Sequence, residues 1–161
     1  MSITNILVVD DDIMICRIVQ RMLSDEHYHI QMSQSVADAF VAIEKSPFDV
    51  YVMDYKLPDG SGLDIAERIR LKCGTVPIIL ISGYDPTSVA LRAEKLSIDE
   101  FLEKPFSRDA IRKAVEKAIG TPVAAAPAIL EAESVSQAQK PRPKGFLPRL
   151  AEIKGRWRKT K

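Results

Sequence analysis

Short, almost wholly apolar runs alternate along this chain with stretches in which apolar residues recur every three or four positions. The runs predict five strands, at residues 5–9, 28–33, 50–53, 76–81 and 98–102. Each intervening stretch predicts an amphipathic helix, because its apolar residues fall on one face. The pattern therefore predicts an α/β fold: a doubly wound, five-stranded parallel sheet with helices on both faces and right-handed crossovers.

Several helix boundaries are marked by residues that bind free helix ends. The Ser-x-x-Asp sequence at residues 35–38 is typical of a capping box and predicts the start of the second helix. Residues 85–86, Asp-Pro, suit the N-cap and first turn of the fourth helix. Ser107 suits the N-cap of the fifth helix, which Gly120 should end.

Polar side chains follow four of the predicted strands. Three aspartates at 10–12 follow the first, Asp54 follows the third, Ser82 the fourth and Lys104 the fifth. Open α/β sheets bind ligands outside the carboxyl ends of their strands. We therefore expect carboxylates, a hydroxyl and an ammonium to lie together at one edge of the sheet.

Four carboxylates placed close together repel one another unless a cation lies among them. Mg²⁺ suits such a site, because it prefers oxygen ligands and takes only a few from the protein. A metal-neutralised Asp54 could then attack phosphorus, while Lys104 and Ser82 would stabilise the transferred group by charge and hydrogen bonding. The pattern favours an aspartyl-phosphate intermediate.

The chain resembles the receiver domain of bacterial two-component response regulators over roughly residues 3–120. The resemblance rests on four motifs in order: Ile6-Leu-Val-Val-Asp-Asp-Asp12, Asp54-Tyr-Lys-Leu-Pro-Asp-Gly-Ser-Gly62, Ile79-Leu-Ile-Ser-Gly83 and Lys104-Pro-Phe106. It implies a flavodoxin-like strand order, 2-1-3-4-5, in a phosphorelay signalling switch. The phosphoryl donor would be a histidine kinase or phosphotransfer protein, and the downstream protein target is not specified.

The resemblance also implies how the acidic residues would divide their work. Asp54 would be the phospho-acceptor. Asp11 would bind Mg²⁺ directly, Asp10 mostly through water, and Lys56 through its backbone carbonyl. No family ligand position corresponds to Asp12.

The same resemblance implies the groups that bind phosphoryl and pass on the signal. Ser82 and Lys104 would contact the phosphoryl group, and the rotamer of Phe101 would follow Ser82. Many members of the family have Tyr where Phe101 stands, so a contact through its hydroxyl is absent. Lys56 and Tyr84 occupy positions that tune the rate of dephosphorylation.

Simpler interpretations remain for each motif. The aspartates at 10–12 could only cap a helix, and Asp54 could only belong to a turn. The triplet also contains an Asp-x-Asp pattern similar to haloacid-dehalogenase-like, Mg-dependent phosphatases. That family would place Thr or Val at Met14 and an acid pair after the fourth strand, where residues 81–84 have none.

Composition narrows the class of protein. No apolar stretch is long enough to span a membrane and no secretory signal precedes the first strand, so we expect a cytoplasmic protein. Cys16 and Cys73 lack metal-ligand spacing and are expected to be packing residues. His27 and His29 have no Cys partner and are expected at the surface. No Gly-rich phosphate loop supports nucleotide binding.

Charge separates the chain into unequal parts. Residues 1–139 contain 14 Lys/Arg and 21 Asp/Glu, whereas residues 140–161 contain nine Lys/Arg and one Glu. We predict a receiver domain at 1–120, an Ala/Pro/Ser-bearing linker at 121–139 and a basic tail at 140–161. Too few residues follow the domain for a typical DNA-binding effector, so sequence-specific DNA binding is not expected.

The tail is open to several interpretations. Leu147, Leu150, Ile153 and Trp157 are spaced for one face of an amphipathic helix, which Gly155 would weaken. The tail could be an unstructured solubilising segment, a peptide for an acidic partner surface, a membrane-surface anchor, a non-specific nucleic-acid contact or a ligand of its own acidic domain.

Two functional hypotheses follow. The first is a switch that modifies itself on Asp54 and has no external substrate to turn over, so it is not an enzyme in the usual sense. The second is an adaptor that acts through its basic tail whether or not Asp54 is phosphorylated.

Overall fold

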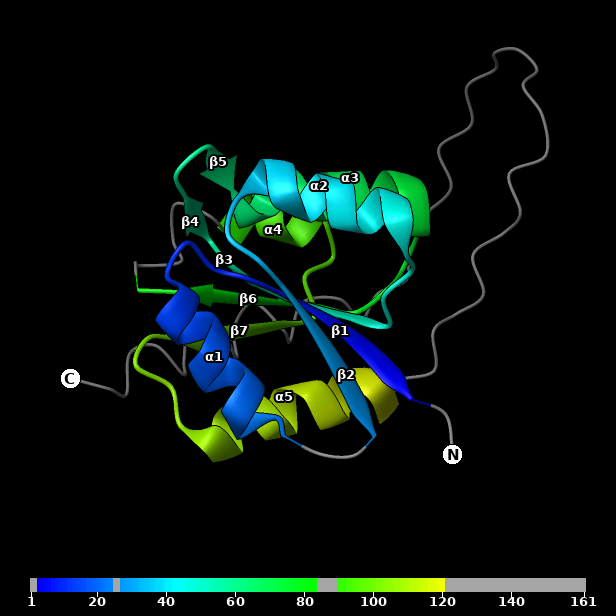
Figure 1. The fold of residues 1–161 in the computed structure, drawn as a ribbon. Coiled ribbons are helices and arrows are strands. Elements are labelled where there is room, and N and C mark those ends of the chain that lie inside the picture. The colour runs from blue at the N-terminus through cyan, green and yellow to red at the C-terminus, as the bar shows by residue number, and fades with distance from the viewer. Residues whose placement is uncertain (1–2, 25–26, 84–89, 121–161) are drawn as a thin grey trace, which may run out of the picture. The chain divides into compact units, whose positions relative to one another are not determined.

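The computed structural model describes residues 3–24, 27–83 and 90–120, which all lie in the first of two compact units, Met1–Ala126. Its main sheet is parallel and has the order β2-β1-β3-β6-β7 (Figure 1). The strands are β1 (Thr4–Val9), β2 (Tyr28–Ser33), β3 (Val50–Asp54), β6 (Ile78–Ser82) and β7 (Glu100–Glu103). In sequence order of these five strands this is 2-1-3-4-5, so the expected flavodoxin-like fold is confirmed.

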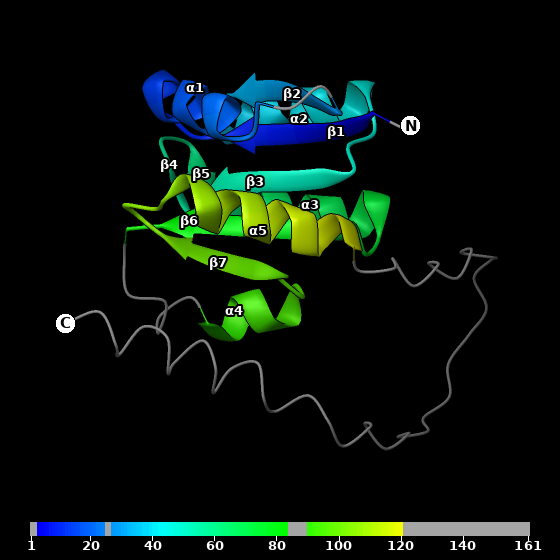
Figure 2. The ribbon, with the colours of Figure 1, turned by 90° about the horizontal axis from the view of Figure 1, so that it is seen from below.

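In the part of the chain that the structure describes, five helices cover the two faces of the sheet. They are α1 (Ile13–Met22), α2 (Val36–Lys45), α3 (Gly62–Cys73), α4 (Ala90–Lys95) and α5 (Arg108–Gly120). Figures 1 and 2 show α2, α3 and α4 on one face and α1 and α5 on the other. Among the described residues, no helix is long and apolar enough to cross a bilayer.

The sheet separates two apolar clusters. Side chains of β1 alternate between them: Leu7 and Val9 pack toward α2 and α3, whereas Ile6 and Val8 pack toward α1 and α5. Every residue of β3 is buried. Burial on both faces explains why these strands are continuous apolar runs, because neither face meets water.

Side chains cap the starts of α1, α2 and α5, and in α2 and α5 the capping residue is the expected one. Asp12 accepts a hydrogen bond from the Met14 amide at the start of α1 (2.8 Å). Ser35 accepts from the Asp38 amide in α2 (3.0 Å). The Ser107 hydroxyl accepts from the Ala110 amide at the start of α5 (3.1 Å). The predicted start of the fourth helix at Asp85 lies outside the described residues.

The structure corrects the predicted strands in two ways. Strands β6 and β7 begin at Ile78 and Glu100, two residues later than expected, since apolar character alone does not distinguish a strand from the loop before it. A small antiparallel pair, β4 (Lys56–Leu57) and β5 (Gly60–Ser61), was not expected. Each strand of this pair has only two residues, too few to show a periodic pattern in the sequence.

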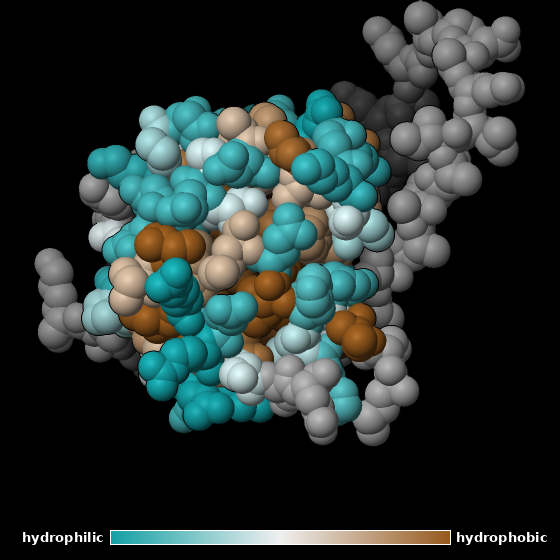
Figure 3. Space-filling view, in the orientation of Figure 1, coloured by the Kyte–Doolittle hydropathy of each residue, from teal (hydrophilic) through white to brown (hydrophobic). Residues whose placement is uncertain are grey.

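The apolar face of α1 is narrower than its sequence suggests. Cys16 and Val19 are buried, but two other apolar residues of this helix are exposed, Ile18 to 41% and Met14 to 56%. On the face of the molecule seen in Figure 3, apolar patches alternate with polar side chains. Because its side chain is exposed, Ile18 is a surface residue of the helix rather than part of the core.

The two cysteines pack in or against the apolar clusters, whereas the side chains of the two histidines are partly or fully exposed. Both cysteines are free thiols; Cys16 is buried, and burial raises its pKa to about 11. Its thiol donates to the Asp10 carbonyl oxygen (3.5 Å), so it packs beneath the acidic loop. His29 is exposed and His27 is half-buried.

Candidate functional site

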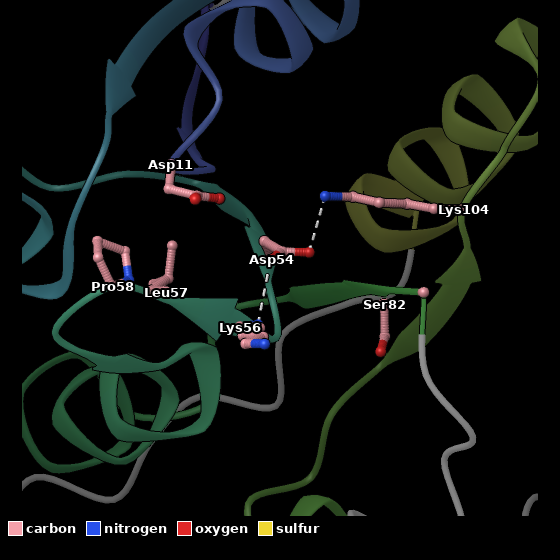
Figure 4. A pocket seen from close by; sticks show the side chains of 8 residues that line it. Asp11, Asp54, Lys56, Leu57, Pro58, Ser82 and Lys104 are labelled. Atoms are coloured by element: carbon pink, nitrogen blue, oxygen red, sulfur yellow. Dashed lines mark hydrogen bonds and ion pairs between the residues drawn. The ribbon is translucent and has the colours of Figure 1, made fainter.

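A pocket opens where the carboxyl ends of the central strands meet. Asp11 follows β1, Asp54 ends β3, Ser82 ends β6 and Lys104 follows β7. The residues that line the pocket are Asp11, Asp54, Lys56, Leu57, Pro58, Ser82, Gly83 and Lys104 (Figure 4). Five of the seven residues predicted for the site therefore share one pocket, and Asp10 and Phe101 are not among its lining residues.

Asp54 is held by hydrogen bonds at both carboxylate oxygens. Its side chain is almost buried, and Oδ2 accepts from the Lys56 amide (3.1 Å). Oδ1 lies 2.9 Å from the Lys104 ammonium (Figure 4). Burial raises the pKa of Asp54 above its ordinary value, although Lys104 acts in the opposite direction. A carboxylate that is desolvated and also oriented in this way is suited to nucleophilic attack.

Lys104 links the end of β7 to the ends of three other strands. Its backbone amide donates to the Ser82 carbonyl (3.0 Å), which joins the end of β7 to the end of β6. Its ammonium donates to Asp10 Oδ2 (2.7 Å) and lies beside Asp54. Burial alone would lower the pKa of Lys104, but the hydrogen bonds to Asp10 and Asp54 raise it above the ordinary value. The side chain is therefore a cation at neutral pH.

The three consecutive aspartates have three different environments. Asp10 is 2% exposed and is not among the lining residues, and its Oδ1 accepts from the Asp12 amide (3.0 Å). Asp11 lies in the pocket wall, and Figure 4 shows its carboxylate on the same side as Asp54. Asp12 caps α1. The helix-cap interpretation is thus correct for Asp12, whereas the other two face Lys104 or the pocket.

Ser82 and Phe101 lie in different surroundings. Ser82 is 7% exposed and lines the pocket. Phe101 is half-buried in β7, opposite Leu80 of β6, and packs against the apolar cluster under α3 and α4. Because Ser82 follows Leu80 by two positions in β6, it lies on the same face of the sheet as Phe101, on the neighbouring strand. A role for Phe101 as a switch remains a prediction.

Sequence reasoning missed the importance of Gly62. A Cβ at this position would lie 2.4 Å from the backbone oxygen of Asp54 and 2.9 Å from a methyl group of Leu80. The Gly62 amide donates to the Tyr55 carbonyl (2.9 Å), which brings the start of α3 against the end of β3. The Gly-Ser-Gly sequence signalled a turn, but only the fold shows that it is Asp54 that requires the glycine.

The family to which this site belongs follows from comparison with known proteins. The model of the response regulator receiver domain matches residues 6–116, well over half of the chain. The chain belongs to the response regulator receiver family. Phosphorylation-dependent signalling is the general role of this family, and the match favours a receiver over a haloacid-dehalogenase-like phosphatase.

Curated relatives of this receiver are longer proteins. The acid tolerance regulatory protein ActR of Rhizobium meliloti is 32% identical over 111 residues, which cover 69% of this chain and 57% of ActR. The regulatory protein VanR of Enterococcus faecium is 35% identical over 101 residues, covering 63% of this chain and 43% of VanR. The receiver therefore spans about half the length of these relatives, so the similarity concerns one domain of each.

Solved structures of receiver domains have the same architecture. The non-phosphorylated HemR receiver domain from Leptospira biflexa has a TM-score of 0.69 and 27% identity, covering 76% of this chain and 99% of HemR's. A receiver domain from Clostridium thermocellum has a TM-score of 0.66 and 26% identity, covering 73% and 94%. The likeness thus covers most of both known domains.

The donor set of the pocket fits Mg²⁺, the metal that receiver domains typically bind. Within residues 3–24, 27–83 and 90–120, no three His, Cys, Asp or Glu side chains are grouped as a ready-made metal site. The Lys104 ammonium instead lies between Asp10 and Asp54 and supplies the positive charge there. Asp11, Asp54 and Lys56 share the pocket wall, and an ion that takes few protein ligands and keeps its waters suits such an open set.

Proposed function

We propose that this receiver is a phosphorylation-dependent signalling switch that accepts a phosphoryl group on Asp54 from the phosphohistidine of a kinase or phosphotransfer protein. The observation that carries the proposal is the environment of Asp54. Its desolvated carboxylate, the Lys104 ammonium at 2.9 Å and the Asp11 and Ser82 side chains line one pocket.

The residues of this pocket have separable roles in the reaction. An oxygen of Asp54 attacks phosphorus, the bond from phosphorus to the donor's imidazole nitrogen breaks, and the imidazole leaves with the electron pair. Lys104, already beside Asp54, transfers its hydrogen bond to an oxygen of the incoming group. The hydroxyl of Ser82 donates to another. The product is an acyl phosphate on the protein itself, so no external substrate is turned over.

Mg²⁺ would be held in this pocket by the Asp11 and Asp54 carboxylates and the Lys56 carbonyl, with Asp10 acting through water. When bound, it would neutralise charge that otherwise repels an incoming phosphate. Receivers commonly use Mg²⁺, and the oxygen donors lining this pocket support the same use here.

We further propose a domain order of receiver (1–120), linker (121–139) and basic tail (140–161). Helix α5 is described as far as Gly120, and the proposed linker and tail lie outside the described residues. The excess of Lys and Arg in the tail favours an acidic protein surface or an anionic membrane as its target. In this arrangement, Ser82 and Phe101 would change conformation on phosphorylation and alter the surface of β7 and its neighbouring helices.

Incubation with Mg²⁺ and acetyl phosphate tests the central claim. Mass spectrometry should detect one added phosphoryl group, labile to hydroxylamine as an acyl phosphate must be. Asp54→Asn should abolish the addition. Asp38→Asn, which changes an exposed aspartate in α2, should leave it unchanged. Labelling of Asp54→Asn at the wild-type rate would exclude Asp54 as the acceptor.

A further inference from the structure

One wall of the pocket is a hairpin that is hydrogen-bonded to a helix far from it in the sequence. Lys56, Leu57 and Pro58 line the pocket, and the strand pair β4–β5 closes the hairpin. Asp59, the next residue, is not among the lining residues. Its carboxylate instead accepts two hydrogen bonds, Oδ1 from the Val36 amide (2.8 Å) and Oδ2 from the Ala37 amide (2.9 Å).

These two amides belong to the first turn of α2, more than twenty residues earlier in the chain. Amides of the first turn have no partner within their own helix, and the helix end is positive, so a carboxylate is well suited to bind them. The hydrogen bonds from Val36 and Ala37 lower the pKa of Asp59 below its ordinary value. The carboxylate is thus charged at neutral pH and uses both oxygens in the contact.

Packing supports the same contact. The backbone of Gly60 lies so close to α2 that a Cβ at this residue would be 3.1 Å from a methyl group of Val36. Val36 is itself part of the apolar core. The hairpin is therefore fixed on one side by core packing and by two charged hydrogen bonds to α2.

The other side of the hairpin reaches the reacting group. The Lys56 amide donates to Asp54 Oδ2 (3.1 Å). The helix that Asp59 binds is also linked to the site, because it follows β2, whose Ser33 carbonyl accepts from the Asp10 amide (3.2 Å). Loss of the Asp59 contact would therefore allow the backbone of Lys56, three residues earlier in the same hairpin, to shift.

We propose that Asp59 is a positioning residue for the phosphoryl site: it clamps the β4–β5 hairpin to α2 and so holds the Lys56 amide and carbonyl beside Asp54. The carbonyl role rests on the function proposed above. Partners of this kind, which orient a ligand without touching the metal, typically change metal affinity by about 10- to 100-fold when they are removed.

Helix α2 offers a matched control. Ser35 caps the same helix end through a different amide, that of Asp38 (3.0 Å), which belongs to α2 itself and not to the hairpin. Ser35→Ala and Asp59→Ala each remove cap interactions from α2, but only Asp59→Ala releases the hairpin. Asp59→Asn keeps one carbonyl oxygen as an acceptor and should restore part of the effect.

The experiment measures Mg²⁺ affinity by calorimetry on the full chain, together with thermal unfolding. We expect Asp59→Ala to weaken Mg²⁺ binding about tenfold, Asp59→Asn to weaken it less, and Ser35→Ala to change it less than about twofold although its stability also falls. In the metal-free protein, Asp59→Ala should also speed hydrogen exchange at the Val36 and Ala37 amides.

Two results would overturn the inference alone: wild-type Mg²⁺ affinity in Asp59→Ala, or an equal loss in Ser35→Ala, which would mean that helix stability is all that matters. If Asp59→Ala does not fold, the same comparison is made between Asp59→Asn and Ser35→Ala. A wild-type protein that neither binds Mg²⁺ nor accepts phosphoryl would overturn the proposed function and this inference together.

Discussion

The ammonium nitrogen of Lys104 lies 2.9 Å from Oδ1 of Asp54, although β3, which Asp54 ends, and β7, which Lys104 follows, are not neighbours in the sheet. Lys104 follows β7, and β6 lies between that strand and β3. The same ammonium also reaches Asp10 beyond β3, at 2.7 Å. One long side chain therefore neutralises two carboxylates that the sheet buries side by side.

Removal of this cation should destabilise the protein. Lys104→Met would leave Asp10 and Asp54 buried without a counter-charge, and we expect a loss of about 1–3 kcal/mol in the free energy of unfolding. Mg²⁺ should restore part of it, because it supplies positive charge to the same carboxylates. Urea unfolding with and without Mg²⁺ measures both effects.

Lys117→Met is the matched control for that experiment. Lys117 pairs with Glu100 at 2.6 Å, but its side chain is 62% exposed, so its loss should cost less than about 1 kcal/mol. Equal losses in the two variants, or no effect of Mg²⁺ on Lys104→Met, would mean that the buried pair is not what stabilises this edge of the sheet.

Asp54 and Asp59 should titrate on opposite sides of the ordinary aspartate pKa of 3.8. Burial raises the pKa of Asp54, so its contribution to stability is greatest below the unfolded pKa and is lost as pH rises through the folded value. Amide hydrogen bonds lower the pKa of Asp59, so its contribution is present above the unfolded pKa and is lost as pH falls through the folded value. Carbon-13 NMR titration of the carboxyl groups in metal-free protein measures both pKa values. A pKa of Asp54 below that of Asp59 would contradict the prediction.

Neighbouring acids should have unequal effects on metal binding. Asp11→Ala should weaken Mg²⁺ binding and phosphotransfer together, because Asp11 lines the pocket beside Asp54. Asp12→Ala should leave Mg²⁺ affinity nearly unchanged and instead cost about 1 kcal/mol of stability, because it removes the cap of α1. Calorimetry and chemical unfolding separate the two effects. Similar losses of Mg²⁺ affinity in both variants would contradict the assignment of Asp11, rather than Asp12, as the metal ligand.

Gly62→Ala should be strongly destabilising. Its Cβ would meet the Asp54 backbone oxygen at 2.4 Å, a distance at which backbone must move. We expect a loss of more than about 2 kcal/mol and slower phosphorylation, since the displaced atom belongs to the proposed acceptor. Gly120→Ala is the control, because a Cβ there would meet no heavy atom within 4 Å. Thermal unfolding of the two variants should differ accordingly, and equal melting temperatures would contradict the steric argument.

Much of this architecture could be predicted from the sequence for a simple physical reason. Strands buried on both faces must be apolar throughout, so β1, β3 and β6 are visible as runs, and residues such as Asp54 and Ser82 mark where they end. The parallel sheet then brings those ends together. Polar residues far apart in the sequence could therefore be expected to lie together from the sequence alone.

Contacts between elements could not be predicted in the same way. Local sequence does not show that the carboxylate of Asp59 reaches the first turn of α2. Nor does it show that Gly62 closely approaches the backbone of Asp54. These contacts depend on how the helices pack, and the spacing of apolar residues predicts each helix but not its neighbours.

Truncation after Gly120 tests the proposed domain boundary. Among the described residues, those that line the pocket and those that form the strands of the sheet all lie before Gly120. The truncated protein should therefore fold, with a melting temperature close to that of the full chain, and should still gain a phosphoryl group on Asp54 in Mg²⁺. Circular dichroism and intact mass spectrometry check the two expectations. A truncated protein that unfolds or is not phosphorylated would place part of residues 121–161 within the domain.

The truncation should have a different effect on binding, because it removes the basic tail. Residues 140–161 carry nine Lys/Arg and one Glu, so binding of the full chain to vesicles rich in anionic lipid, or to an acidic protein, should weaken as salt rises from 50 to 300 mM, by about an order of magnitude. The truncated protein should show no such binding at any salt concentration. Replacement of the basic residues of the tail by Gln in the full chain should reproduce the loss and leave phosphorylation of Asp54 intact. Salt-sensitive binding that survives both changes would assign the interaction to the receiver itself.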